Sequence, residues 1–578
     1  MIREEFRVLL VDASNGRGKI VLLDGRNEVA GGSGLAALLY NKYGQPELDW
    51  DDPSQPLIFA IGPLTGYFPL MSKTVFAFKS GYHNEYTESH AGGRLALSLR
   101  FSDLDGLVIR GCADRQSCLS ISAHSLELQD VEFMAGMDSE STGRLIRRMH
   151  KKGSGHRSIL RIGPAGEAGL AMACVNVDTF RHFGRMGGGA ALGAKNIKAI
   201  IIHGDSDFTI PAGKAYPRLY KDVYARVTAT DMMRKYHNLG TPANLEKLNA
   251  ISSLPWENLR KTSDSAIAGI TGKVFADEAL LKNGACSGCP VGCIHVGFIR
   301  EKMARDNRYH FHQVSYDYEP IFALGTMLGV VKPFDILRIL DEMEKSCLDA
   351  MSGGVALAWA AEATEKGFIS RKETLVDLRF GDGKGFREAA RYLGRGGNEF
   401  YRLLGQGTLK AAAVYGGEEF GCVLGQEMAG YATGELFFAA QTLGFRHSHL
   451  DTGAYGYDQK VSEKDVGKAV DFLINDEPAR VFLTSMVACL FARSVYKEDL
   501  LAECLESVGF STLAGQVGET AEHIRRLRWQ VRAKTGFKPE NFSIPKRFYN
   551  IRTWKGQVDA DYLDSLKNEY GRRIVELM

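Results

Sequence analysis

The sequence lacks a long apolar run, and this absence excludes an ordinary transmembrane helix. No stretch of the 578 residues approaches the roughly 18 consecutive apolar residues that cross a bilayer. The opening MIREEFRVLLVDASNG carries acidic side chains and alternates as a strand does, so it has neither the basic start nor the apolar stretch of a secretory signal. We therefore expect a cytoplasmic protein with no membrane span.

An excess of charge of one sign is also missing. The formal net charge is +2, from 71 Lys and Arg against 69 Asp and Glu. General nucleic-acid binding depends on a basic surface, so we expect no nucleic-acid partner. The chain is too long for one hydrophobic core, which favours two or three domains.

Cysteine is sparse, and the ten residues are too scattered for a disulfide framework. Three of them nevertheless share the loop CSGCPVGC, as Cys286, Cys289 and Cys293. The chain lacks the second C-x-x-C pair of a zinc ribbon, whereas a [4Fe–4S] cluster takes four cysteines, commonly three local and one remote. We expect a [4Fe–4S] cluster, with structural zinc or unliganded thiols as the alternatives. The candidates for the fourth ligand are Cys112, Cys118, Cys174, Cys347, Cys422, Cys489 and Cys504.

Hydrophobic patterning changes once along the chain. Before about Ser206 the apolar residues form short β-type runs, which are FRVLLVD, KIVLLDG, PLIFAIG, GLVIRG, SILRIG and AIIIHG. Later segments such as PFDILRILDEMEKSCLDAM have the spacing of three and four that is typical of helices. We predict an α+β protein with a β-sheet base domain at residues 1–205 and two mainly helical domains at 206–410 and 411–578. The glycine-rich stretch RFGDGKGFREAARYLGRGGNEF marks the second boundary weakly, and no internal repeat is apparent.

Glycine clusters in the first 200 residues do not fit the usual nucleotide loops. AGGSGLAALLY has Ala37 at the third glycine position, and no acidic residue about 20 positions later ends a second strand. In GRMGGGAALGAKNIKAIII, Gly193 precedes Ala194 instead of the P-loop lysine. The clusters either let backbone N–H groups approach a phosphate-bearing ligand closely or are plain turns.

Taken together, the glycine clusters and the cysteine loop resemble the aldehyde ferredoxin oxidoreductase family, tungsten enzymes with two pterins on the metal and one [4Fe–4S] cluster. The resemblance runs along nearly the whole chain. Its motifs are GPLTG at 62–66, AGGR at 91–94, IGPAGE at 162–167, GRMGGGAALGAKNIKAI at 184–200, the cysteine loop, YEPIFALG at 318–325 and PKRF at 545–548. It implies a base of two β-sheets over which the pterins lie, with two helical domains closing above them.

The resemblance also implies the reacting residues. Cys489, in TSMVACLFA, matches the family's fourth cluster ligand. Glu319 matches its active-site glutamate, and His449, in RHSHLD, lies near the position of its histidine, with His447 as a rival. A carboxylate and an imidazole can take protons from water and polarise a carbonyl near neutral pH. The structural alternatives are a helix-capping glutamate and a histidine that only donates hydrogen bonds.

By the same resemblance, twelve residues hold the pterins. They are Lys73, His90, Ala91, Gly92, Gly93, Arg94, Arg185, Gly187, Gly188, Glu344, Asp349 and Thr484. Some depart from the family: Glu344 and Thr484 replace the two motif aspartates, and Lys73 replaces an arginine. A lysine offers a point charge instead of a two-pronged donor, and Thr484 leaves one pterin without a charged acceptor. We therefore expect a divergent branch of the family.

The expected reaction is oxidation of an aldehyde to a carboxylic acid, or the reverse. The expected cofactors are a tungsten or molybdenum bis-pterin centre, with Mg²⁺ between the pterin phosphates, and the cluster. Electrons would pass to a ferredoxin or an iron–sulfur subunit, and oligomerisation is left open. Alternatives are an aromatic acyl-CoA ring reductase of the same family and a pterin-free electron-transfer or scaffold subunit. Tyr82, Tyr86, Tyr316 and Phe311 favour an apolar or aromatic substrate.

Overall fold

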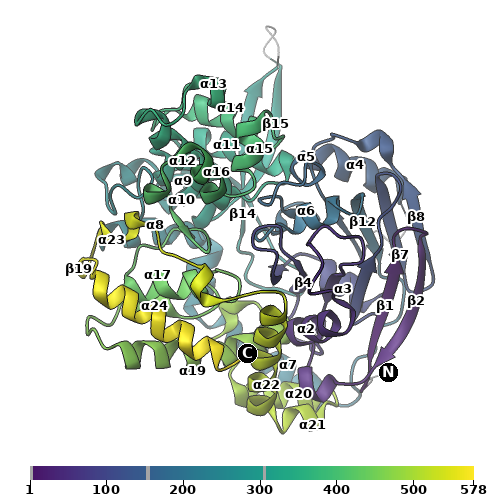
Figure 1. The fold of residues 1–578 in the computed structure, drawn as a ribbon. Coiled ribbons are helices and arrows are strands. Elements are labelled where there is room, and N and C mark those ends of the chain that lie inside the picture. The colour runs from purple at the N-terminus through teal and green to yellow at the C-terminus, as the bar shows by residue number, and fades with distance from the viewer. Residues whose placement is uncertain (1–3, 152–155, 304–307) are drawn as a thin grey trace.

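The computed structural model describes residues 4–151, 156–303 and 308–578, and its first third contains two six-stranded β-sheets (Figure 1). The first sheet has the order β2-β1-β6-β3-β4-β5 and comprises β1 (Phe6–Asp12), β2 (Arg17–Leu23), β3 (Leu57–Ala60), β4 (Thr74–Lys79), β5 (Tyr86–Ala91) and β6 (Gly106–Arg110). The second has the order β11-β10-β9-β12-β7-β8 and comprises β7 (Ser117–Ser122), β8 (Leu126–Asp130), β9 (Arg157–Arg161), β10 (Val175–Val177), β11 (Arg181–Phe183) and β12 (Ile197–His203). All six β-type runs identified in the sequence are strands.

The two sheets share one topology. Replacing β1 to β6 by β7 to β12, in order, converts the first sheet into the second. Each sheet has one parallel pair, β1 with β6 and β12 with β7, and its other pairs are antiparallel. The base is therefore an internal structural repeat, which the sequence interpretation missed.

The sheets pack face to face, and helices cover their outer faces. Leu9 of the first sheet lies in a buried cluster with residues of the second. Side chains alternate between the faces of a strand, so Val8 points the other way, into the core shared with α2 (Gly32–Tyr43). On the far side, Ile201 packs with α4 (Ser139–Met149).

The rest of the chain is mainly helical, as predicted. Its helices of six or more residues are α7 (Ala215–Thr228), α8 (Asn244–Ala250), α9 (Gly272–Glu278), α10 (Tyr318–Leu324), α11 (Pro333–Ser346), α12 (Ala350–Glu365), α14 (Gly383–Leu393), α15 (Glu399–Leu404), α16 (Thr408–Tyr415), α17 (Glu435–Leu443), α19 (Val466–Ser485), α20 (Glu498–Ser507), α22 (Val517–Lys534) and α24 (Ala560–Val575). The glycine-rich stretch near the proposed second boundary is itself partly helical, since it contains α14. The predicted α+β class, with a sheet base followed by mainly helical parts, is confirmed.

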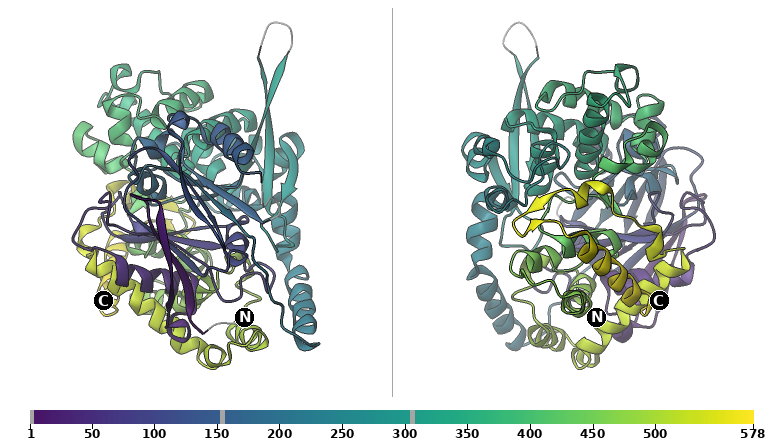
Figure 2. Two further views of the ribbon diagram at one scale, coloured as in Figure 1. Left: turned by 90° about the vertical axis from the view of Figure 1, so that its right-hand side faces the viewer. Right: turned by 60° about the vertical axis from the view of Figure 1, so that its left-hand side comes forward.

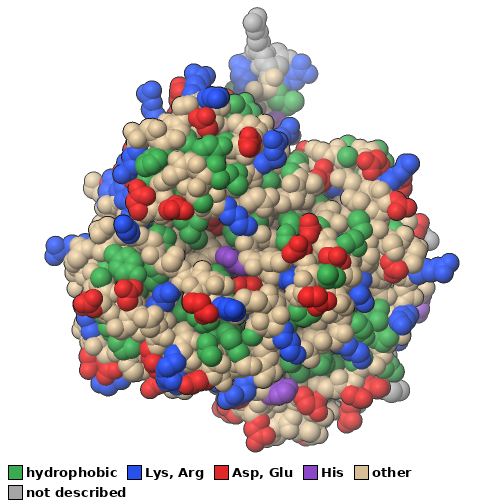
Figure 3. Space-filling model, viewed as in Figure 1, with side chains coloured by type: hydrophobic (Ala, Val, Ile, Leu, Met, Phe, Trp, Pro, Cys, Tyr) green, Lys and Arg blue, Asp and Glu red, His purple; other side chains and the backbone are tan. Residues whose placement is uncertain are grey.

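A three-stranded sheet lies within the helical part and was not predicted. It consists of β13 (Leu280–Gly284), β14 (Ile294–Lys302) and β15 (Tyr309–Tyr316), and its hairpin projects from the body of the protein (Figure 2). Basic and acidic side chains are interspersed over the face drawn in Figure 3, in keeping with the small net charge.

Within the described ranges, no single helix has both the length and the apolar composition needed to cross a membrane. One pair, Tyr318–Leu328 with Pro333–Ser346, meets both conditions only when it is joined across a 112° bend.

Two glycines of the base accept the ends of two helices. Gly62 follows β3 and Gly163 follows β9, each within an Ile-Gly-Pro sequence. A Cβ on Gly62 would lie 2.6 Å from the carbonyl carbon of Met486, just beyond α19. A Cβ on Gly163 would lie 2.5 Å from the carbonyl oxygen of Ser346, the last residue of α11. Only glycine leaves room for backbone to approach this closely.

Beyond each of these helices the chain makes the same turn. Val487 and Cys347 both have φ of 53°, in the left-handed region. The Val487 carbonyl accepts the backbone N–H of Lys73 at 3.0 Å, and the Cys347 carbonyl accepts that of Cys174 at 2.8 Å. Lys73 and Cys174 each lie eleven positions after the glycine of their half. The two helical regions are therefore attached to the base in equivalent ways.

Substituting Gly62 tests this attachment. Gly62→Ala places its Cβ against backbone atoms that cannot rotate away, and we expect destabilisation of about 1–3 kcal/mol, as in an overpacked core. The measurement is urea unfolding followed by circular dichroism. The matched control is Gly456→Ala in α18 (Ala454–Asp458), where an added Cβ has nothing within 4 Å. Equal midpoints for the two variants would contradict the account.

Candidate active site

A cavity in two adjoining parts lies between the base and the helical regions. One part, of about 290 Å³, is lined by Cys286, Cys289, Cys293 and Cys489. The other, of about 370 Å³, is lined by Glu319. Residues that line both parts are His90, Gly184, Arg185, Met351, His449, Leu450, Leu490 and Phe491. Residues that are far apart in sequence, from His90 of the base to Phe491 of the helical part, therefore meet at one site.

Backbone hydrogen bonds bring Cys489 to the cysteine loop. The Leu70 N–H donates to the Gly288 carbonyl at 3.2 Å, and the Leu70 carbonyl accepts the Cys489 N–H at 3.0 Å. The loop is also tied to the base, because the Ser287 N–H donates to the Gly93 carbonyl at 3.1 Å. A single residue of the base, Leu70, thus connects segments about 200 positions apart.

The other cysteines lie elsewhere. Cys118, Cys422 and Cys504 are buried in apolar clusters, and Cys112 contacts the Ala194 carbonyl. Cys174 and Cys347 lie where the end of α11 meets the second half of the base, and Cys174 lines the part of the cavity that holds Glu319. Of the seven candidates for the fourth ligand, Cys489 shares the cavity wall with the loop.

The four thiols suit a cluster better than a single ion. Among the described residues, no three or more His, Cys, Asp or Glu side chains are grouped closely enough to ligate one metal ion. A [4Fe–4S] cluster binds each thiolate through a different iron atom, so its ligands stand further apart than those of zinc. Burial raises the pKa of Cys289 to about 12 and that of Cys293 to about 11, so both need a bound cation to become thiolates.

Two cations accompany these thiols. Lys73 and Arg181 line the same part of the cavity. Burial lowers the pKa of Lys73, but Cys489, Cys286 and Cys293 more than offset this and raise it. The pKa of Arg181 is raised in the same way, against burial, by nearby cysteines and Asp317. Both side chains therefore stay charged beside a group that would carry negative charge.

Glu319 and His449 form a hydrogen-bonded pair. Glu319 lies in the first turn of α10, and its Oε1 is 3.3 Å from Nε2 of His449. The Tyr431 hydroxyl donates to the same oxygen at 3.0 Å. Burial raises the pKa of Glu319, but the hydrogen bonds from His449 and Tyr431 and the charge on His449 outweigh it and lower the pKa. The carboxylate is therefore ionised near neutral pH.

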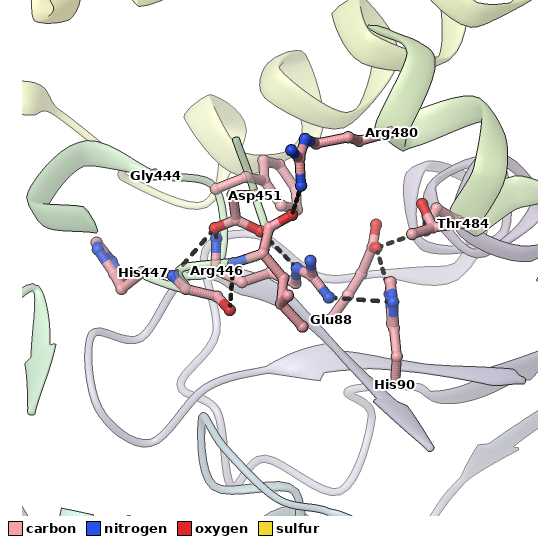
Figure 4. A network of polar contacts seen from close by, with 12 residues as sticks. Glu88, His90, Gly444, Arg446, His447, Asp451, Arg480 and Thr484 are labelled. Atoms are coloured by element: carbon pink, nitrogen blue, oxygen red, sulfur yellow. Dashed lines mark hydrogen bonds and ion pairs between the residues drawn. The ribbon is translucent and has the colours of Figure 1, made fainter. Parts of the chain in front are cut away.

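A buried network fixes the loop that carries His449 (Figure 4). Asp451 accepts the backbone N–H groups of Arg446 at 2.7 Å and Ser448 at 3.1 Å. The Arg446 guanidinium donates from Nε to Asp451 at 2.7 Å and from Nη1 to Nδ1 of His90 at 3.0 Å. His90 Nε2 then lies 3.1 Å from Glu88. A guanidinium can only donate, so His90 accepts at Nδ1 and donates to Glu88.

His447, the rival histidine, does not line either part of the cavity. Its Nδ1 lies 2.9 Å from the Thr442 carbonyl, and its Nε2 accepts from Arg532 at 2.9 Å. Burial and the charge of Arg532 lower its pKa well below the ordinary value. His447 is fully buried and holds the loop in place.

Two of the residues expected at the pterins, Glu344 and Thr484, occupy corresponding positions in the two halves. In the second half, Glu344 is 2.8 Å from His182, and Asp349 caps α12 and is 3.2 Å from Arg185. In the first half, Thr484 stands where the second half has Glu344, because each accepts the N–H of the left-handed residue three positions later.

A carboxylate still lies near Thr484, on a strand instead of a helix. Ser33 donates to Glu88 at 2.8 Å and contacts the Thr484 hydroxyl at 3.0 Å. Arg528 pairs with Glu88 at 2.8 Å, and both side chains are buried. Glu88 lines the cavity, so this half has a charged acceptor that sequence reasoning missed.

Several expected pterin contacts lie outside the cavity wall. Ala91 points into the core between the sheets, and Gly188 packs against Phe76. Gly187, with φ of 88°, caps a short helix. Arg94 is half exposed and its N–H donates to Asp178. Gly92 lies against Cys286, where a Cβ would be 2.5 Å from the thiol sulfur.

Three donors that line the cavity have no partner among the described residues. They are Arg181 Nε, Arg185 Nη1 and His449 Nδ1, and all three atoms are buried. Buried donors without partners are costly, so such atoms mark places where a ligand completes the hydrogen bonding. Two guanidinium donors and an imidazole suit the negatively charged groups of a bis-pterin metal centre and its substrate.

Sequence reasoning named the wrong aromatic residues. Tyr82 and Tyr86 hydrogen-bond to buried carboxylates, and Phe311 is 60% exposed on the projecting sheet. The aromatic side chains that line the cavity are Tyr236, Tyr431, Tyr455 and Phe491. No local sequence pattern marks these four residues or Arg181 and His182 as functional. Arg181 and His182 lie just before the GRMGGG motif.

Comparisons with known proteins agree with this arrangement. Models of the aldehyde ferredoxin oxidoreductase N-terminal domain and of domains 2 and 3 match residues 8–204 and 218–573. The chain belongs to the aldehyde ferredoxin oxidoreductase family. The family resemblance seen in the sequence is thereby confirmed.

The chain is similar to two proteins of Pyrococcus furiosus. The chain is 27% identical over 544 residues to the tungsten-containing aldehyde ferredoxin oxidoreductase of Pyrococcus furiosus, covering 90% of this chain and 86% of that protein. It is 27% identical over 409 residues to the aliphatic sulfonate oxidoreductase, WOR-like subunit, of the same organism, covering 66% and 62%.

A solved structure shares the fold. It is the active site complex BamBC of benzoyl coenzyme A reductase with 1,5-dienoyl-CoA, at a TM-score of 0.83 and 17% identity, covering 99% of this chain and 95% of that one. A coarse conclusion follows from these comparisons together: the chain is an oxidoreductase of this family.

Replacing the remote cysteine tests the four-thiol set. In Cys489→Ser, three thiols remain, and we expect the iron content of anaerobically purified protein to fall by at least half because a cubane needs four ligands. Cys112→Ser is the matched control, since Cys112 lies outside the cavity. Unchanged iron in Cys489→Ser would show that another residue supplies the fourth ligand.

Proposed function

We propose that the protein oxidises an aldehyde to its carboxylic acid, or runs the reverse reaction, beside a tungsten or molybdenum bis-pterin centre. The overall change is RCHO + H₂O → RCOOH + 2 electrons + 2 protons. The observation that carries the proposal is the Glu319–His449 pair, which faces a cavity continuous with the four-cysteine set. The Glu319–His449 pair can thus accept and donate protons, and a cluster on the four cysteines could accept electrons.

Glu319 is suited to accept a proton from water. Its carboxylate is ionised near neutral pH and is oriented from two sides, by His449 and by Tyr431. A base held in this way removes a proton as the water oxygen forms its bond to the carbonyl carbon. The hydrogen bond from Tyr431 also restricts rotation of the carboxylate.

His449 is suited to orient the carbonyl group. Its Nε2 contacts Glu319, and its buried Nδ1 has no partner among the described residues. When the imidazole carries a proton on both nitrogens, Nε2 donates to Glu319 and Nδ1 can donate to the carbonyl oxygen on which charge develops. Arg446 and Asp451 hold the histidine loop against the base, so the imidazole stays at a fixed place relative to the sheets.

The residues present fit the expected cofactors. Lys73, Arg185, Glu344 and Asp349 would hold the pterins, and Cys286, Cys289, Cys293 and Cys489 the cluster. When bound, the metal centre takes up two electrons, and the cluster passes them on singly. Mg²⁺ between the pterin phosphates and a ferredoxin or iron–sulfur subunit as electron acceptor belong to the same proposal.

The two alternative functions predict different properties. An aromatic acyl-CoA ring reductase would act on thioesters and not on free aldehydes. An electron-transfer or scaffold subunit would need neither the Glu319–His449 pair nor the unpaired donors of Arg185 and His449. The aldehyde reaction accounts for both features.

Replacement of Glu319 tests the catalytic assignment. We expect Glu319→Gln to lower kcat for aldehyde oxidation by about 10²–10⁴-fold, because the amide cannot accept a proton. Activity is measured by viologen dye reduction under anaerobic conditions, and metal content is measured on the same samples. Glu388→Gln, on the exposed side of α14, is the control. Full activity in Glu319→Gln with full metal content would rule out this role.

A further inference from the structure

The part of the cavity that holds Glu319 has aromatic walls. Tyr236 and Phe491 stack with ring centroids 3.9 Å apart and planes 6° apart. Tyr431 and Tyr455 lie 5.0 Å apart, and Tyr431 is 4.9 Å from the ring of His449. All four tyrosine and phenylalanine side chains line the part of the cavity that holds Glu319. A flat ring is the kind of substrate that such walls accept.

The segment that carries Tyr236 is fixed to the cysteine loop. Tyr236 lies in a π-helix, Met233–Leu239, and the His237 ring contacts the Val291 carbonyl at 2.9 Å. Short π-helical segments are frequently found at functional sites. The aromatic wall is therefore built on the same support as the cluster ligands and does not depend on a free loop.

Two cations, Arg493 and Lys235, lie near these aromatic side chains. Arg493 lines the cavity, and Nζ of Lys235 lies 5.2 Å from the Tyr236 ring. Within the described parts of the chain neither cation forms an ion pair, and Arg493 donates to the Leu490 carbonyl at 2.9 Å.

The carboxylates of the cavity do not neutralise this charge. Glu319, Glu344 and Asp349 are each paired, with His449, His182 and Arg185. Asp317 has its pKa raised to about 6 by burial and by Glu319, while Arg181 and His182 oppose the shift. Among the described residues that line this part of the cavity, Arg493 is therefore a cation without an ion pair.

We propose that the substrate is an aromatic aldehyde with a carboxylate on its ring, and that Arg493 binds this carboxylate while the aldehyde faces Glu319 and His449. The inference rests on the proposed function and names its substrate class. The ring lies between the aromatic walls, and the two ends of the ligand are recognised separately. A guanidinium forms a strong charge-assisted hydrogen bond with a carboxylate, which favours this anion over a neutral group of the same shape.

Equilibrium binding tests the inference without turnover. Anaerobic holoenzyme is titrated calorimetrically with terephthalate and with its dimethyl ester, which has the same ring and no carboxylate. We expect terephthalate to bind roughly tenfold more tightly, a preference that Arg493→Gln removes and Arg493→Lys partly restores. Lys221→Gln, on the exposed face of α7, should keep the preference. Equal binding of the two ligands by the wild type would overturn the inference.

Catalytic turnover provides a second test of the same inference. The ratio of kcat/KM for 4-carboxybenzaldehyde to that for methyl 4-formylbenzoate should be about ten in the wild type and near one in Arg493→Gln. Preferential terephthalate binding without oxidation of any aldehyde would support the anion site and refute the proposed reaction. Displacement of terephthalate by free coenzyme A would overturn the ring-carboxylate assignment, because phosphates would then be the natural occupants.

Discussion

The close approach of two helix ends to two glycines is the contact on which the whole site depends. Gly62 and Gly163 leave no room for a side chain, so the ends of α19 and α11 lie directly on the turns after β3 and β9. The left-handed residue that follows each helix then offers its carbonyl to the base. These paired attachments set the width of the cavity and the position of every group on the helical side.

The same attachment carries different side chains in the two halves. The first half has Lys73 and, two positions after the left-handed turn, Cys489. The second has Cys174 and Asp349 at the corresponding positions. Substitution on a duplicated frame thus creates one wall of thiols and cations and another of carboxylates and imidazoles. In the proposed reaction, this asymmetry would let protons and electrons leave the substrate on different sides.

Much of this could be predicted from sequence. Strong β-type runs such as FRVLLVD and helical periodicity such as that of residues 333–351 indicated the order of the layers, because burial of one face dominates local structure. The spacing of Cys286, Cys289 and Cys293 predicted a shared site, and the structure places all three on one cavity wall. The family resemblance added Cys489, Glu319 and His449, which no local pattern could have selected.

The rest depended on contacts between distant segments. The repeat of the two sheets is nearly invisible in sequence, apart from Ile-Gly-Pro at 61–63 and 162–164, since topology is preserved while side chains change. Glu88 and Arg493 matter only through what the fold places beside them. Glycines 187 and 188 were expected at the ligand, and in the structure they also lie against Ala171 and Phe76, because a missing Cβ serves packing and ligand approach equally well. Tyr82 and Phe311 were chosen by residue type without knowledge of which face they occupy.

Elemental analysis of the anaerobically purified protein tests the central claim most directly. The account predicts about one tungsten or molybdenum and about four irons per chain, the content of a bis-pterin centre beside one cubane cluster. Iron without the heavier metal would contradict it and would make the protein an electron-transfer subunit. Zinc alone would show that the four thiols serve a different site altogether.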